Sequence, residues 1–156
     1  MVYSKEKHLE LMISACTHPM TGTLNTDAYD FLYRMANIYR VWDDLWDKDK
    51  EVSKEQADDV ISDLAFELSR NKFYKENQAA LEAFIFVSWN AWSDANIWKG
   101  HDNKMKALCA WFVRDYCCEI TALVAWLVGG KEHARNLSLT IREFFVIRLI
   151  ENGVKL

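Results

Sequence analysis

Three pairs of polar side chains, each with its two members four residues apart, are the part of this sequence best suited to chemistry. The pairs are Asp43 with Asp47, Asn90 with Asp94, and Asp115 with Glu119. On an α-helix a spacing of four residues places both side chains on one side, one turn apart. Carboxylate and amide oxygens are ligands that hard divalent cations prefer, and Mg²⁺ often holds a substrate phosphate as well. The sequence therefore predicts a Mg²⁺ or Mn²⁺ site with these six residues as ligands.

The surroundings of these pairs strengthen the case for a ligand. Two of the pairs lie within stretches that are otherwise apolar. Burial of a carboxylate costs free energy unless the group is paired, hydrogen-bonded or bound to a metal. Few cations are spaced to pair with these groups: Arg40 can reach Asp44, whereas Arg114 is expected to point away from Asp115. The alternative is a buried polar network that includes tryptophan N–H and tyrosine hydroxyl groups.

A second candidate site lies at the start of the last expected helix. Gly129 and Gly130 precede this helix, whose free N–H groups would face an anion. Arg135, Ser138 and Arg142 fall on one side of it. The two arginines are therefore candidate contacts for a small phosphorylated molecule, and ordinary surface charge is the alternative. No residue of the sequence stands out as a general base.

Helices are the elements that must position these residues, because apolar residues recur with the helical period along the whole chain. Ser53 and Gln56 form a capping box, Asn103 is a cap, and either Thr26 or Asp27 caps the second helix. The expected helices span residues 4–16, 26–47, 54–70, 73–99, 104–128 and 131–151, with a break at Gly129–Gly130 and a stop at Gly153.

The expected fold is a single all-α domain over residues 1–156, built as one compact bundle of five or six helices. The helices at 73–99 and 104–128 are apolar on nearly all sides, so we expect them to be central. In the second helix, apolar spacings of three and four residues predict the core side chains Phe31, Met35, Ile38, Trp42 and Leu45.

Composition restricts the classes of function. The chain has 156 residues, 51% of them hydrophobic, and a net charge of −4, which disfavours disorder and a surface for duplex nucleic acid. Its acidity is local, because residues 43–67 hold ten acidic residues and three lysines. The most apolar stretch contains Arg114, Asp115 and Glu119, so no membrane span is expected. The four cysteines form no CxxC motif and the N-terminus lacks a signal-peptide core, so the expected location is the reducing cytoplasm.

The segment Asp43-Asp44-Leu45-Trp46-Asp47 resembles the aspartate-rich DDxxD motif of class I isoprenoid (terpene and prenyl) synthases. The resemblance implies a helix end that lines an aromatic-walled cavity, where Mg²⁺ holds a substrate diphosphate. It also implies a second metal motif on another helix. Asn90 and Asp94 are similar to the start of that motif, but Trp98 stands where its third ligand would be and cannot coordinate.

A second likeness concerns the expected third helix. The tryptophans Trp42 and Trp46 and the segment 57–69 are similar to the second and third helices of all-α nucleotide pyrophosphohydrolases of the dimeric dUTPase and MazG type. That family's metal site would need Asp59 and Asp63 to face inward, and a Glu-x-x-Glu that the earlier helix lacks. The apolar stripe Val60, Leu64 and Leu68 instead predicts that both aspartates are solvated.

Two functions from different classes remain open at this stage. The first is a divalent-metal site that binds, or acts on, a small molecule bearing a diphosphate, and the sequence leaves open whether this is an enzyme. The second is a non-catalytic helical interaction protein, with a homo-oligomer as one form. In that case aromatic residues in excess of the core would form a contact patch, and the acidic segment 43–67 would steer a basic partner.

Overall fold

Helices make up nearly all of this computed structural model, which describes residues 2–48 and 50–151. Within those residues no strand occurs, and the extended pairing is an isolated antiparallel bridge between Thr17 and Leu24. The expected all-α bundle is thereby confirmed, while the helix stop expected at Gly153 lies outside the described residues. The elements are α1 (Val2–Cys16), α2 (Thr26–Asp47), α3 (Lys54–Ser62), the π-helical η1 (Asp63–Glu67), α4 (Leu68–Arg70), α5 (Lys72–Lys99), α6 (Lys104–Arg114), the 3₁₀-helical η2 (Asp115–Glu119) and α7 (Ile120–Glu151).

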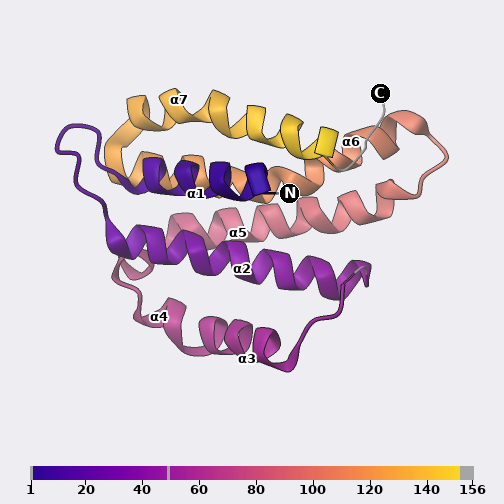
Figure 1. The fold of residues 1–156 in the computed structure, drawn as a ribbon, viewed down its shortest axis with the longest axis horizontal. Helices are drawn as coiled ribbons and strands as arrows, with labels where there is room; N and C mark the ends of the chain where they lie inside the picture. Colours follow the sequence, from indigo (N-terminus) through magenta and orange to yellow (C-terminus); the bar gives the residue numbers. More distant parts are fainter. Residues whose placement is uncertain (1, 49, 152–156) are drawn as a thin grey trace.

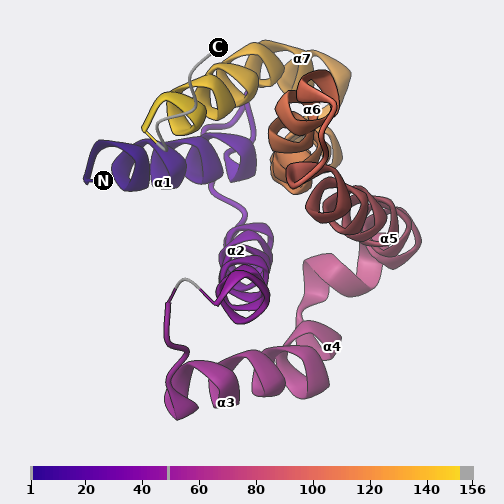
Figure 2. The same ribbon diagram turned by 90° about the vertical axis from the view of Figure 1, so that its right-hand side faces the viewer.

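Helix α2 lies in the middle of the arrangement. Figure 2 shows α1 and α7 on one side of it, α3 and α4 on the other, and α5 with α6 along one edge. Helix α5, the helix expected at 73–99, contacts α2, α4, α6 and α7, although it lies along one edge of the arrangement. It is not buried on all sides, however, because Phe86, Val87 and Ile97 are exposed.

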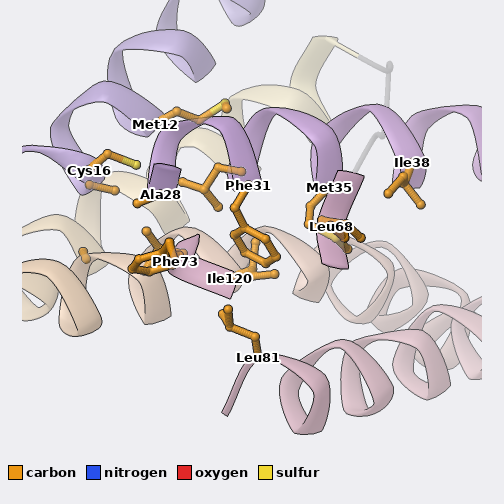
Figure 3. Packing of buried hydrophobic residues seen from close by; sticks show 14 residues of the cluster. Met12, Cys16, Ala28, Phe31, Met35, Ile38, Leu68, Phe73, Leu81 and Ile120 are labelled. Carbon is orange, nitrogen blue, oxygen red and sulfur yellow. The ribbon is translucent and has the colours of Figure 1, made fainter. Parts of the chain in front are cut away.

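The main core forms around the inner side of α2. Figure 3 shows side chains of α1, α2, α5 and α7 meeting near Phe31, which is fully buried. Phe31, Met35 and Ile38 are buried as predicted, whereas Leu45 is 52% exposed. The reason is that the buried face continues in steps of three residues through Val41 to Asp44. Each step of three residues rotates the buried face by about 60° around the helix axis, in the direction that takes it away from position 45.

The predicted caps are confirmed at two helices and wrong by one residue at a third. Ser53 and Gln56 make the full capping box of α3, and the side chain of Asn103 accepts hydrogen bonds from two backbone N–H groups at the start of α6. Helix α2 is capped by Asn25, whose side-chain oxygen accepts from the N–H of Ala28 at 3.0 Å. Asparagine is a strong N-cap, so this residue outcompetes the threonine that follows it.

The expected third helix is interrupted, and its inner side differs from the predicted one. Asp63 is buried and Leu68 is buried, but Ile61 and Leu64 are 62% and 57% exposed. Asp59 is exposed as predicted, whereas the prediction of a solvated Asp63 is wrong. The physical reason is an ion pair between Arg34 of α2 and Asp63, which draws Asp63 inward. The π-helical segment that begins at Asp63 changes the helical register, so Leu68 then faces the core.

Two glycines break the helix within α7, as predicted, and the chain reverses its direction there. Gly130 has φ 80° and ψ −173°, so the helix breaks there and the second part returns along α1 (Figure 1). At Gly129 an added Cβ would lie 2.5 Å from Cδ of Pro19, so a side chain would collide with the loop after α1. Neither α7 nor any other helix among the described residues is long and apolar enough to cross a membrane.

A first prediction follows from this reversal. Gly130→Ala forces an L-residue into backbone torsions that essentially only glycine adopts, so it should lower the free energy of unfolding by about 1–3 kcal/mol. The matched control is Gly100→Ala, because Gly100 has a φ of −99° and an added Cβ there meets nothing within 4 Å. Urea denaturation measures both changes. Equal losses of unfolding free energy in the two variants would contradict the prediction that the backbone at Gly130 requires a glycine.

Candidate functional site

The predicted pair Asp43 and Asp47 faces α5 and α6 and is held by cations. One oxygen of Asp43 accepts a hydrogen bond from Nε1 of Trp92 at 3.1 Å, and its other oxygen pairs with Arg114. Oδ2 of Asp47 lies 3.3 Å from Nη2 of Arg114 and 3.0 Å from Nζ of Lys99. We call these five residues the Asp43–Arg114 cluster. It connects the end of α2 to α5 and to the end of α6.

Aromatic and small side chains fix the two cations of this cluster. Nζ of Lys99 and Cζ of Arg114 each lie 5.8 Å from the ring centroid of Trp111, within the range of a cation–π interaction. Ala95 and Ala110 close the space beside them, and no room for a bound molecule is left between these side chains. The cluster is therefore a closed ion-pair network in this structure, with the charge of each carboxylate compensated.

The expectation that cations are too few to pair with the acidic residues of α2 is wrong. Arg114 points at Asp43 and Asp47, although 71 residues separate it from Asp43. Asp44 pairs at 3.4 Å with Lys50. Arg40, the partner predicted for Asp44, instead donates a hydrogen bond to Asn37 at 2.7 Å. Spacing along one helix cannot predict Arg114 as a partner, because it comes from a different helix.

The predicted ligands Asn90 and Asp94 do not join the cluster, because both are exposed on the outer side of α5. The buried side of that helix instead carries Leu81, Ser88, Trp92 and Ala95. The sequence misled here for a physical reason: when a helix is apolar on nearly all sides, its apolar residues do not identify which side faces the core.

The predicted pair Asp115 and Glu119 is separated by local backbone geometry. The expected single helix at 104–128 is divided by the 3₁₀-helical η2, which spans these two residues. A 3₁₀-helix has 3.0 residues per turn, so residues four apart point about 120° away from each other rather than about 40°. Glu119 accepts a hydrogen bond at 2.9 Å from Nε of Arg142, which joins a predicted metal ligand to a predicted anion contact. The side chain of Arg135 is exposed and makes no ion pair within the described part of the chain.

The six predicted ligands therefore form no single group. In residues 2–48 and 50–151, no group of three or more His, Cys, Asp or Glu side chains is arranged to hold a metal ion. What the fold does bring together is Asp43 with Asp47, as predicted, and Glu119 with Arg142. Sequence reasoning missed Trp92, Lys99 and Trp111, since aromatic and lysine residues on separate helices leave no spacing signal.

A polar groove of about 520 Å³ separates α2 from α3 and η1. Arg34 lies at its centre, where it donates to Asp30 at 2.8 Å and to Asp63, with Glu67 at 3.9 Å. The hydrogen bond to Asp30 raises the pKa of Arg34, and the bond to Asp63 adds to this. An arginine thus stands among carboxylates where the pyrophosphohydrolase resemblance implies a metal. The spacing of four residues between Asp30 and Arg34 is the feature of the sequence that could have predicted their ion pair. The groove is lined by Asp30, Tyr33, Arg34, Asn37, Arg40, Gln56, Asp59, Ser62, Asp63 and Glu67.

A second prediction tests the Asp43–Arg114 cluster. Arg114→Met keeps most of the side-chain volume but leaves Asp43 and Asp47 without their shared cation, so unfolding should become easier by about 2 kcal/mol. The control Lys72→Met removes an ion pair whose two side chains are both exposed, at 74% and 61%, and should cost about 0–1 kcal/mol. Urea denaturation at neutral pH compares the two variants. The assignment would be wrong if Lys72→Met cost as much as Arg114→Met.

Comparison with known proteins identifies no relative of this chain. No protein-family model matches the chain, and no curated protein or solved structure matches it. The likeness of residues 43–47 to the DDxxD motif therefore stays a prediction that rests on the motif itself.

Proposed function

We propose that the chain is a helical interaction protein that associates with a second copy of itself through the outer side of α5. The observation that carries this proposal is that three large apolar side chains on this side are in water: Phe86 is 67% exposed, Val87 52% and Ile97 73%. Phe86 and Val87 are adjacent, and Ile97 lies on the same side of the helix about three turns further along; exposed apolar side chains that gather on one surface and are rimmed by polar residues are typical of a binding site. We call this surface the outer α5 face and define it by Glu82, Phe86, Val87, Asn90, Asp94 and Ile97.

The extent of the outer α5 face suits another helix as its partner. Phe86 and Ile97 are eleven residues apart, which is about three turns or about 16 Å along the helix axis. Helices pack by interlocking side-chain ridges over such lengths. The bundle does not need these side chains for its own core, since the opposite side of α5 is filled by Leu81 and Trp92.

The Asp43–Arg114 cluster supports an interaction role, because ion pairs and hydrogen bonds to other residues of the chain satisfy its two buried carboxylates. Trp92 and Lys99, both on α5, bind Asp43 and Asp47 of α2. Arg114 adds a link from α6. These polar contacts hold α5 in place between its neighbours, so the outer α5 face is presented on a fixed helix. Fixing a binding helix before association lowers the entropic cost of binding.

The cysteines support the reducing, cytoplasmic location that the sequence predicts. No disulfide joins the four cysteines, all of which lie within the described residues; Cys16 is buried and the others are partly buried. Burial raises the pKa of the Cys16 thiol to about 12, so this residue stays a neutral, unreactive thiol at neutral pH.

A second candidate function is the metal-dependent binding of a diphosphate-bearing small molecule at the Asp43–Arg114 cluster. The observation that favours it is that two carboxylates and two cations meet there. If Lys99 and Arg114 turned outward to hold phosphate oxygens, Asp43 and Asp47 would be free to bind Mg²⁺ or Mn²⁺, which would neutralise phosphate charge. The other predicted ligands lie elsewhere in the fold and take no part in this version.

The third prediction tests the outer α5 face by self-association. Sedimentation velocity over a range of protein concentrations should show the wild type associating. Phe86→Ser/Ile97→Ser should weaken this association at least about tenfold, because burial of each large apolar side chain contributes about 1.5–3 kcal/mol. The free energy of unfolding of this double variant should change by about 0.5 kcal/mol or less, as is usual for surface positions. The control is Ile61→Ser/Leu64→Ser, which removes equally exposed side chains from α3 and η1. A wild type that stays monomeric, or an equal effect of the control, would contradict the proposal.

The fourth prediction tests the second candidate by thermal melting. That candidate requires the melting temperature to rise by several degrees when Mg²⁺ and inorganic pyrophosphate are added together, more than with either alone. Asp43→Asn/Asp47→Asn should abolish the rise, and the exposed pair Asp58→Asn/Asp59→Asn should keep it. The interaction protein proposed above requires no such rise. An unchanged melting temperature therefore removes the second candidate.

A further inference from the structure

Asn90 and Asp94 are the polar residues in the middle of the outer α5 face. Both are exposed, and neither side chain makes a hydrogen bond or an ion pair with the residues that the structure describes. The amide of Asn90 therefore offers two N–H donors, and the carboxylate of Asp94 offers two acceptor oxygens. A partner that covers this face has to satisfy a donor and an acceptor that lie one helical turn apart.

These two residues belong to a line of side chains suited to packing against another helix. Val87, Asn90, Asp94 and Ile97 follow one another in steps of three, four and three residues, which keeps them on one side of α5. All four are exposed, and the departure of α5 from helical torsions lies earlier, at Asn77. Alternating steps of three and four residues are typical of the seam along which two helices pack.

The line is symmetric about the level of Trp92, whose own side chain is buried. Asn90 lies two residues before Trp92 and Asp94 two residues after it, while Val87 and Ile97 lie five residues before and after it. In two antiparallel copies of a helix that share one midpoint, a residue before the midpoint lies level with the residue equally far after it. Asn90 of each copy is then level with Asp94 of the other, and Val87 with Ile97.

Phe86 completes the apolar contact at each end of such a pair. It lies within about 20° of Ile97 around the helix axis, so the two side chains are on the same side of the line. A two-fold axis between antiparallel helices brings residues on the same side of the line together. Phe86 therefore approaches Ile97 of the second copy, and the three exposed apolar side chains of the face are buried at both ends of the contact.

We propose that the outer α5 faces of two copies pack antiparallel across a two-fold axis at the level of Trp92, with Asn90 of each copy donating a hydrogen bond to Asp94 of the other. The proposal rests on the function proposed above and specifies how the two copies meet. A hydrogen bond to an ionised acceptor is stronger than one between neutral groups. In paired helices, a polar residue in an otherwise apolar seam sets the register. Asn90 and Asp94 thus determine orientation and register.

Other arrangements of the same two faces leave these polar groups unsatisfied. In a parallel pair Asp94 is level with Asp94 of the second copy, and like charges in contact are unfavourable. In an antiparallel pair centred at Asn90, Asp94 is level with Phe86, where it meets no donor. Of these three arrangements, only the one centred at Trp92 joins each donor to an acceptor.

The remaining acidic group of the face and the shape of the molecule are compatible with this pairing. The Glu82 side chains of the two copies lie at opposite ends of the contact, about 30 Å apart along the helix axis, where salt screens their repulsion. Figure 2 shows α5 along the right-hand edge of the structure, with no other helix beyond it on that side. Because both copies use the same face, the contact is isologous and closes with two copies.

The fifth prediction tests the contact between Asn90 and Asp94 by changing its charges. Asn90→Asp sets two carboxylates against each other and should weaken association at least about tenfold. Asn90→Asp/Asp94→Asn exchanges the two groups, so the contact forms again and association should return to the level of the wild type. Asn90→Lys sets an ammonium group against Asp94 of the second copy and should strengthen association at least about threefold. In a parallel pair the same lysines would meet each other and weaken it. Sedimentation velocity measures association, and the wild type should stop at the dimer.

The matched control is Asn136 of α7. It is an exposed asparagine that, like Asn90, has an acidic residue one helical turn away, which is Glu132. Asn136→Asp and Asn136→Lys therefore make the same changes in net charge and in local charge spacing, and both should leave association unchanged. Circular dichroism establishes that every variant is folded.

The outcomes separate this pairing from the proposed function. If Asn90→Lys weakens association, if the exchange does not restore it, or if the wild type grows beyond the dimer, the antiparallel pairing is wrong. If Phe86→Ser/Ile97→Ser weakens association while the Asn90 variants associate like the wild type, the pairing is again wrong and the proposed function stands. If the wild type never associates, both are wrong.

Discussion

The pairing of Arg114 with Asp43 and Asp47 is the interaction on which the arrangement of α2, α5 and α6 depends. All three side chains are largely buried, at 17%, 28% and 15% exposure. Charges so placed must be paired, because removing one partner leaves the other buried and uncompensated. The need to satisfy both aspartates brings the end of α6 to the end of α2, and Lys99 and Trp92 bring α5 to the same point.

The helices, most of their caps and the helix break at Gly130 could be predicted because each depends on residues close together in the sequence. A capping box needs only Ser53 and Gln56, and a helix break needs only a glycine whose torsions other residues avoid. Phe31, Met35 and Ile38 could be predicted as core because α2 has one clear apolar side. Local rules fail where a tertiary contact overrides them, as Arg34 does when it turns Asp63 inward.

The candidate site could be predicted only in part. That Asp43 and Asp47 share one side of a helix is a local property, and it holds. Their partners come from helices far along the chain, and the apolar character of α5 on nearly all sides conceals which side is buried. The apolar neighbours of Asn90 and Asp94 therefore predict an inward position for both, although Trp92 between them is the residue that faces the core. The 3₁₀ turn at Asp115–Glu119 has no sequence signal that we can identify.

The two sides of α5 differ in how their charges are compensated. Its inner side meets the carboxylates of α2, where every acidic charge of the cluster has a cation within hydrogen-bonding distance. Its outer side keeps Glu82 and Asp94 without a cation among the described residues, beside apolar side chains in water. Charges that are compensated internally contribute little to association, since a bound partner gains nothing by approaching them. In the proposed interaction, a partner therefore meets Glu82, Asp94 and the apolar side chains beside them, and not the paired charges of the inner side.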